Sequence, residues 1–253
     1  MTGDYRWDLM SAIDAEDSRA RAAGHIHGGR GIDGRAYLEQ FPNSWGEILS
    51  CDPRWRHNGD LVWAMAQLGM VDGEVLDLTA GRLVFWKSYR PERLTLNDLF
   101  VFNDEIGYHE DYTDLPDGWT DQYNTVFYDP KYKLAGSPQV QDFNIRYGVV
   151  DPAKLPARMW DVVAGLAEAK RVSKRWVHVK CQNQVAHHRY RDQVAEVVQA
   201  MAAIGGMTLV AEWTFVNSHP QPQPQYKPNG DWNPRRRARN NTSTMLSFLK
   251  GTP

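Results

Sequence analysis

The residues with the clearest chemical potential are Asp129, Pro130, Lys131 and Tyr132, which follow an apolar run at residues 125–128 (Thr-Val-Phe-Tyr). Such a run predicts a buried strand, and an acid, a proline and an aromatic residue at its end place chemistry at the carboxyl edge of a sheet. Open α/β sheets bind their ligands at that edge. The Asp129 carboxylate and the Pro130 carbonyl could both accept hydrogen bonds from an N–H group there.

A second segment with chemical potential runs from Val75 to Trp86 and contains an acid, Asp77, followed by Thr79 and Gly81. A glycine at the end of a strand lets a ligand approach the backbone, and a helix that follows offers free N–H groups. Taken alone, one glycine favours a plain turn over a ligand site.

Strands and helices must alternate along the chain to position these residues. Apolar residues recur at helical spacing in three segments, at 61–68, 155–172 and 190–204. Short apolar runs predict strands at 74–78, 94–96, 125–128, 176–181, 207–216 and 243–249. Asp60 is the expected N-cap of the first helix. This alternation indicates a doubly wound sheet, and the two final strands, with no long helix between them, predict an antiparallel hairpin at its edge.

The two candidate segments resemble motifs of S-adenosylmethionine-dependent DNA methyltransferases that modify adenine N6 or cytosine N4, of the small phage and prophage type. Residues 129–132 resemble their Asp-Pro-Pro-Tyr loop, with Lys131 at the second proline. Residues 75–86 resemble their cofactor loop, with Leu83 at the second glycine. The resemblance covers residues 55–250 and includes the segments 133–138, 179–184 and 235–244.

The resemblance implies an α/β, Rossmann-like methyltransferase fold, with a mostly parallel sheet and an antiparallel C-terminal hairpin. Residues 1–54 would be a partly helical extension, and residues 55–253 the catalytic domain with a long basic loop at 217–241. S-adenosylmethionine would be the cofactor. Its binding residues would be Asp77, Thr79, Gly81, Asp98 and Asp111.

Two of these cofactor residues have separate implied roles. Asp98 follows the expected strand at 94–96 and would accept both ribose hydroxyls, whereas Asp111 would accept a hydrogen bond from the adenine amino group. A helix cap or a solvated surface charge remains the alternative for each acid. The order of glycine loop, two acids and then Asp129 favours the cofactor interpretation.

The implied catalytic residues are Asp129, Pro130 and Tyr132. Asp129 and the Pro130 carbonyl would hold the amino group so that its lone pair can attack, and Tyr132 would stack on a base taken out of its duplex. Substrate contacts would come from seven residues: Lys131, Lys133, Gln182, Arg235, Arg236, Arg237 and Arg239. A strand-ending turn at Gln182 and a solvated arginine run are the alternatives.

Composition is that of an ordinary soluble globular protein, with 253 residues, 42% hydrophobic and 24% charged. No run approaches the roughly 18 apolar residues of a membrane span, and residues 1–17 lack the plan of a signal peptide. Cys51 and Cys181 are far apart, and His187 and His188 have no partner at metal-ligand spacing, so we predict no disulfide framework and no metal site. We expect a cytoplasmic protein that makes no membrane contact.

Charge is distributed unevenly, although the net charge of −2 gives no overall attraction to nucleic acid. Residues 92–121 hold nine acids and one basic residue, whereas residues 227–250 hold six basic residues and one acid. An acidic surface could hold a cationic ligand and a basic surface could hold phosphates. Two solvated faces are the alternative.

The sequence thus predicts methyl transfer to an amino nitrogen of a nucleobase, with DNA as the partner. No separate recognition domain is evident, so we expect relaxed specificity or a homodimer that completes the DNA groove. Leu83 and Lys131 keep two alternatives open. One is a methyltransferase acting on RNA, a nucleotide or a modified base. The other is a nucleic-acid-binding module that has lost its cofactor.

Overall fold

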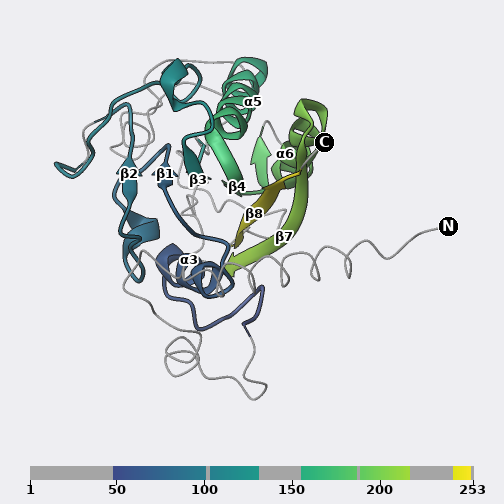
Figure 1. The fold of residues 1–253 in the computed structure, drawn as a ribbon. Coiled ribbons are helices and arrows are strands. Elements are labelled where there is room, and N and C mark those ends of the chain that lie inside the picture. Colours follow the sequence, from purple (N-terminus) through teal and green to yellow (C-terminus); the bar gives the residue numbers. More distant parts are fainter. Residues whose placement is uncertain (1–47, 101–102, 131–154, 187–188, 217–241, 252–253) are drawn as a thin grey trace, which may run out of the picture.

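The computed structural model of the chain describes residues 48–100, 103–130, 155–186, 189–216 and 242–251. Six strands form one sheet in these ranges (Figure 1). In sheet order they are β2 (Leu94–Leu96), β1 (Val75–Asp77), β3 (Tyr123–Tyr128), β4 (Ser173–Cys181), β8 (Thr242–Lys250) and β7 (Met207–Val216). A second, two-stranded sheet pairs β5 (Gln184–Ala186) with β6 (Arg189–Arg191).

Strand directions confirm the expected fold class. Strands β2, β1, β3 and β4 run parallel to one another, whereas β8 runs antiparallel to β4 and to β7. The last two strands therefore form the predicted antiparallel hairpin, with β8 inside the sheet and β7 at its edge. This is the mostly parallel Rossmann-like arrangement that the sequence resemblance implied.

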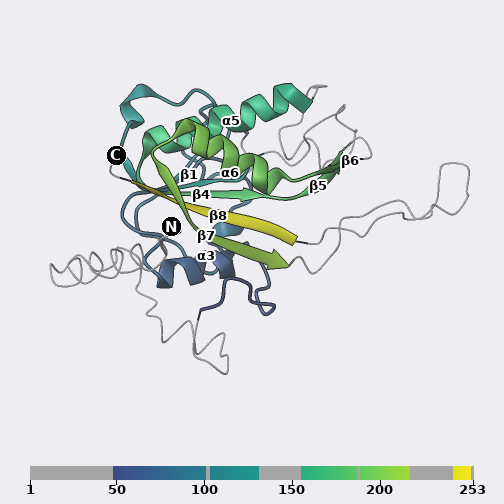
Figure 2. The same cartoon turned by 90° about the vertical axis from the view of Figure 1, so that its right-hand side faces the viewer.

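Helices cover both faces of the sheet. Figure 2 shows α5 (Leu155–Val172) and α6 (Gln193–Ile204) over one face and α3 (Asn58–Gln67) over the other. Two short 3-10 helices, η1 (Val84–Trp86) and η2 (Asp117–Trp119), lie in the connections. No helix within the described ranges is long and apolar enough to cross a membrane.

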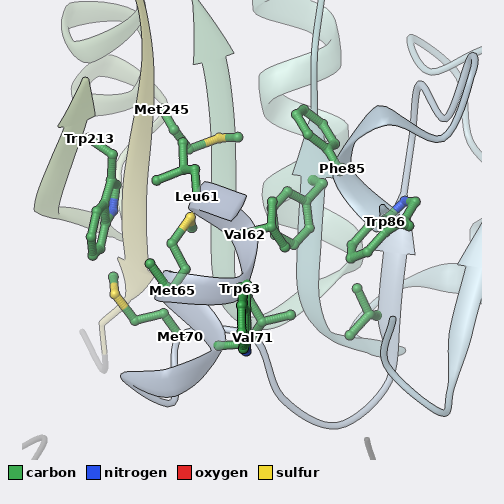
Figure 3. Packing of buried hydrophobic residues seen from close by; sticks show 14 of the residues in the cluster. Leu61, Val62, Trp63, Met65, Met70, Val71, Phe85, Trp86, Trp213 and Met245 are labelled. Atoms are coloured by element: carbon green, nitrogen blue, oxygen red, sulfur yellow. The ribbon is translucent and has the colours of Figure 1, made fainter. Parts of the chain in front are cut away.

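Apolar side chains pack on each face. On the α3 side, Leu61, Val62 and Met65 lie between Trp213 and Met245 of the C-terminal strands and the aromatic residues of η1 (Figure 3). All of these side chains are at most 6% exposed. The helical spacing seen in the sequence is the spacing that turns these residues toward the sheet.

Two helix starts differ from the sequence prediction. Asp60 was wrongly predicted as an N-cap: α3 begins at Asn58, and Asp60 lies in its first turn, where its carboxylate accepts the Arg56 N–H (2.8 Å) and the Ser88 hydroxyl. Helix α6 begins at Gln193 rather than Tyr190, because the Asp192 side chain accepts the Ala195 N–H (3.2 Å) and caps it there. The two residues before this cap belong to β6.

A buried histidine joins three strands of the sheet to the connection before β1. His178 of β4 is 0% exposed, and its Nε2 lies 2.7 Å from the carbonyl oxygen of Met70. Since a carbonyl only accepts, Nε2 carries the proton, and Nδ1 accepts from the Ser247 hydroxyl at 2.9 Å. Ser247 in turn accepts the Trp213 indole N–H at 3.1 Å. A neutral imidazole with its proton on Nε2 satisfies all of these bonds.

Burial lowers the pKa of His178 to about 4, although its bond to Met70 acts in the opposite direction. An unfolded histidine has a pKa of about 6.5, so between these values the unfolded chain binds more protons than the folded one. We therefore expect His178 to remove stability as the pH falls from about 6.5 to about 4, by up to about 3 kcal/mol. Urea unfolding of the wild type and of His178→Gln across this range measures the effect.

His178→Gln is the matched variant because glutamine keeps one donor and one acceptor. All other titrating groups are common to both proteins, so their contributions cancel in the difference. The variant should show a flatter dependence of unfolding free energy on pH than the wild type. Equal slopes would show that His178 is not responsible.

Candidate active site

The carboxyl ends of the parallel strands bring the predicted acids to one edge of the sheet. Asp77 is the last residue of β1, and Asp98 follows β2 by two residues. Asp129 follows β3 directly, beside the end of β4, because the register pairs Tyr128 with Val179. The order of these strands in the sheet therefore places all three carboxylates at the same edge.

Asp77 is buried, with 1% exposure, and its carboxylate has two donors. The indole N–H of Trp86 donates to Oδ2 at 2.8 Å, and the backbone N–H of Thr79 donates to Oδ1 at 3.2 Å. Burial raises the pKa of Asp77 to about 7; the two hydrogen bonds oppose that shift, and the nearby Asp129 and Asp98 add to it. Asp77 therefore fixes the shape of the loop that follows β1.

Asp98 holds the glycine of the same loop. Its Oδ2 accepts the backbone N–H of Gly81 at 2.9 Å, and its Oδ1 accepts the N–H of Phe100 at 3.0 Å. Gly81 has φ +49°, a conformation that favours glycine. The predicted ribose contact of Asp98 remains a prediction, because a carboxylate has further lone pairs beyond these two bonds.

Asp111 lies in a locally bonded turn. It is exposed, and its Oδ1 accepts both the N–H (2.9 Å) and the hydroxyl (2.8 Å) of Thr113. This geometry resembles the capping alternative more than a prepared ligand contact. The adenine contact predicted for Asp111 is not tested by the structure.

Asn97 connects these loops and was not singled out from the sequence. Its side chain is 0% exposed and donates to the carbonyl oxygens of Leu78 (3.1 Å) and Glu110 (3.0 Å), while its Oδ1 accepts the Glu110 N–H (2.8 Å). Asn97 therefore ties the loop after β1 to the segment that leads to Asp111. Its place directly after the β2 run was the only signal in the sequence.

Asp129 is held by two hydrogen bonds, one to its backbone and one to its side chain. Its backbone N–H donates to the Thr79 hydroxyl at 2.8 Å, so this predicted cofactor residue contacts the predicted catalytic one. Oδ2 accepts from the Lys180 ammonium at 3.1 Å. Oδ1 is buried and has no hydrogen-bond partner among the described residues. A carboxylate oxygen in this state could accept an N–H, as the predicted catalytic role of Asp129 requires.

Gln182, directly after β4, is hydrogen-bonded to β8 and to α6. Its side chain is 7% exposed, and Nε2 donates to the carbonyl of Thr242 at 3.0 Å, at the start of β8. Its backbone N–H donates to Oε1 of Gln193 at 3.0 Å. These bonds hold the end of β4 against β8 and α6, and the predicted substrate contact remains a prediction.

The other predicted site residues are only partly placed. Pro130 is buried next to Asp129 and is the last described residue before a gap. Seven predicted residues lie outside the described ranges: Lys131, Tyr132, Lys133, Arg235, Arg236, Arg237 and Arg239. Most of the expected N-terminal extension, and the loop at 217–241, also lie outside them.

Leu83, which stands at the second glycine of the resembled motif, has a backbone conformation that favours glycine. Its φ is 57° and its ψ 34°, in the left-handed region, while its side chain is 8% exposed in the α3-side core. A left-handed leucine costs about 1–2 kcal/mol in conformational energy. The position therefore keeps the turn of a glycine-containing loop and adds a buried side chain.

This conformation predicts an unusual order of stability for two variants. Leu83→Ala should lose about 2–5 kcal/mol through the cavity that it leaves. Leu83→Gly should lose similar packing but relieve the backbone strain. We therefore expect the glycine variant to be more stable than the alanine variant by about 1 kcal/mol. Chemical unfolding of both variants tests this order. A less stable glycine variant would contradict the strain at Leu83.

Comparisons with known proteins give matches at the level of structure only. No family model and no curated protein matches the sequence. The N-methyltransferase NodS from Bradyrhizobium japonicum, solved with S-adenosylhomocysteine, is 10% identical with a TM-score of 0.46, over 86% of this chain and 98% of that one. Magnesium protoporphyrin IX methyltransferase from Synechocystis, solved with S-adenosylmethionine, is 12% identical with a TM-score of 0.41, over 88% and 99%.

A provisionally assigned DNA modification methylase from Thermus thermophilus is also similar. It is 9% identical with a TM-score of 0.36, over 72% of this chain and 54% of that chain. The similar proteins therefore differ in substrate. The substrate of this chain has to be inferred from its own site residues.

Proposed function

We propose that this protein transfers a methyl group from S-adenosylmethionine to the exocyclic amino nitrogen of adenine or cytosine in DNA. The observation that carries the proposal is the Asp129 carboxylate, whose buried Oδ1 has no donor among the described residues. It lies at the ligand-binding edge of the sheet, and its backbone is bonded to the loop after β1. The DNA target follows from the resemblance of residues 129–132 to the loop of amino-methylating enzymes.

The charge of this edge suits the proposed cofactor. Asp77, Asp98 and Asp129 bring three carboxyl groups to the edge, close to the Lys180 ammonium. S-adenosylmethionine carries a sulfonium and an ammonium group, and both are favoured near carboxylates. The Gly81 loop, held by Asp98, and the segment tied by Asn97 are the parts of the chain that we assign to binding it.

When bound, S-adenosylmethionine supplies an electrophilic methyl group. The residues of the chain have the task of making an amino nitrogen nucleophilic, because its lone pair is delocalised into the base ring. Oδ1 of Asp129 and the carbonyl of Pro130 would each accept one N–H of the amino group. Two such bonds favour a pyramidal nitrogen, whose lone pair is free to attack. Positioning and electrostatics would then provide most of the rate enhancement.

The proposal is tested by isotope transfer. The purified protein is incubated with S-adenosylmethionine that carries a deuterated methyl group, together with duplex DNA, single-stranded DNA, RNA or mononucleotides. Digestion to nucleosides and mass spectrometry then locate the label, with Asp129→Ala as the control. We expect label on the amino nitrogen of adenine or cytosine from DNA.

Each other outcome changes the conclusion. Label found only in RNA or mononucleotides would overturn the DNA assignment and keep methyl transfer. A protein that binds S-adenosylmethionine but labels none of the four substrates would overturn the nucleobase assignment. Absence of cofactor binding at millimolar concentration would overturn methyl transfer itself.

A further inference from the structure

Lys180 forms an ion pair with the proposed catalytic carboxylate. Its ammonium lies 3.1 Å from Oδ2 of Asp129, and the two side chains are 10% and 12% exposed. The parallel register of β3 and β4 makes this pair, because Tyr128 lies opposite Val179 and the next residue of each strand is Asp129 and Lys180. The pair is thus set by the sheet and not by a flexible loop.

The Lys180 ammonium also contacts an aromatic ring. Lys180 Nζ lies 5.7 Å from the centre of the Phe85 ring, within the range of a cation–π interaction. Phe85 belongs to η1, in the loop that follows β1, and is 2% exposed. The position of the ammonium is therefore set by strand β4, which carries Lys180, and by its contact with the Phe85 ring.

Stability alone gives a poor reason for this arrangement. Removing two charges from water is costly, and well-packed apolar residues often stabilise a fold as well as a buried ion pair does. Orientation of the carboxylate is a better reason, because within the described ranges only its Oδ2 has a hydrogen-bond partner. With Oδ2 occupied by Lys180, and the backbone held by Thr79, the carboxylate cannot turn without losing its partner.

We propose that Lys180 is a positioning residue for the methyl transfer, an inference that rests on the proposed function. By holding Oδ2, the ammonium directs Oδ1 of Asp129 toward the place of the amino group. Lys180 acts through Asp129, and the orientation of Oδ1 matters most when the amino nitrogen becomes pyramidal. Loss of Lys180 should therefore lower kcat more than it raises KM for the base-containing substrate.

Lys180→Met tests this with a side chain of similar length and no charge. We expect kcat to fall about 10²-fold, the size of effect that a small misplacement produces. The Kd for S-adenosylmethionine should stay within about threefold, because the loss lies in the transition state and not in ground-state binding. Lys180→Arg keeps the charge with a different geometry and should recover part of the lost kcat.

Lys174→Met is the matched control. Lys174 lies on the same strand β4, but it is exposed and near the opposite end. The same substitution there should leave kcat, KM and cofactor affinity unchanged. Thermal unfolding of each variant shows whether a lost activity is simply a lost fold.

The outcomes separate this inference from the proposed function. A wild type that methylates no nucleobase overturns both. An active wild type with a folded Lys180→Met variant of equal kcat overturns the role of Lys180 alone, and so does a variant in which only KM rises. Where the methionine variant fails to fold, Lys180→Gln, which keeps an N–H donor for Asp129, replaces it. Unfolding of both variants would assign Lys180 to stability and overturn the positioning role.

Discussion

Replacing Asp129 with alanine is expected to lower kcat/KM for base methylation by about 10²–10³-fold, as the loss of one oriented polar group in an active site commonly does. The variant removes Oδ1, the buried acceptor that has no donor among the described residues, and takes the Asp129 carboxylate away from the Lys180 ammonium. The first loss acts on the amino nitrogen, and the second leaves a positive charge near a cationic cofactor without the neighbouring negative charge of Asp129. Steady-state methylation of DNA with labelled S-adenosylmethionine measures the change.

Two further variants sharpen this test. Asp129→Asn keeps an oxygen that can accept the amino N–H but loses the ion pair, so it should be more active than the alanine variant and less active than the wild type. Asp104→Ala removes an exposed acid from the acidic segment and should leave turnover unchanged. Equal activity of Asp129→Ala and wild type would remove Asp129 from the reaction and contradict the proposed catalytic site.

The strands and the long helix α5 were predictable because their apolar residues form runs or recur at helical spacing. The runs at 94–96, 155–172 and 207–216 have the same bounds as β2, α5 and β7. The central strands β3 and β4 are buried along most of their length, as their continuous apolar runs indicate, and α5 shows a clear helical period. The order of elements along the chain then predicted the doubly wound sheet.

Contacts across the sheet were harder to predict. The pairing of Asp129 with Lys180 joins residues 51 positions apart and depends on the register of β3 against β4. A run of apolar residues predicts that a strand exists but does not specify which residue lies opposite which. A one-residue shift would turn the Lys180 side chain to the other face of the sheet. The sequence therefore suggested an acid at this edge but did not single out Lys180 as its partner.

Which acid near a helix start caps the helix was also not predictable from residue type alone. Asp60 and Asp192 are both acids near the start of a helix, yet only Asp192 accepts an N–H as an N-cap. Asp60 is bonded instead to Ser88, which is distant in sequence. The β5–β6 hairpin was missed for a different reason: Gln184–Ala186 and Arg189–Arg191 do not form apolar runs.

Replacing Asp98 with alanine is expected to weaken S-adenosylmethionine binding by about 10–10²-fold, the size of a hydrogen bond to a charged group. Asp98 holds the Gly81 N–H at 2.9 Å and thereby fixes a loop whose glycine already has a positive φ. Without this acceptor the loop must be ordered when the cofactor binds, at an entropic cost. Isothermal titration of the wild type and the variant with S-adenosylmethionine measures the difference in Kd.

Asp111→Ala is the informative comparison for Asp98. The bonds that the structure gives to the Asp111 side chain are to Thr113, and the residue is exposed, so its geometry predicts a change in Kd of only a few-fold. An adenine contact would instead predict a loss close to that of Asp98→Ala. Wild-type affinity in Asp98→Ala would contradict the assignment of the Gly81 loop to the cofactor. Because both acids belong to the same negatively charged segment, a difference between the two variants must come from the position of each carboxylate and not from net charge.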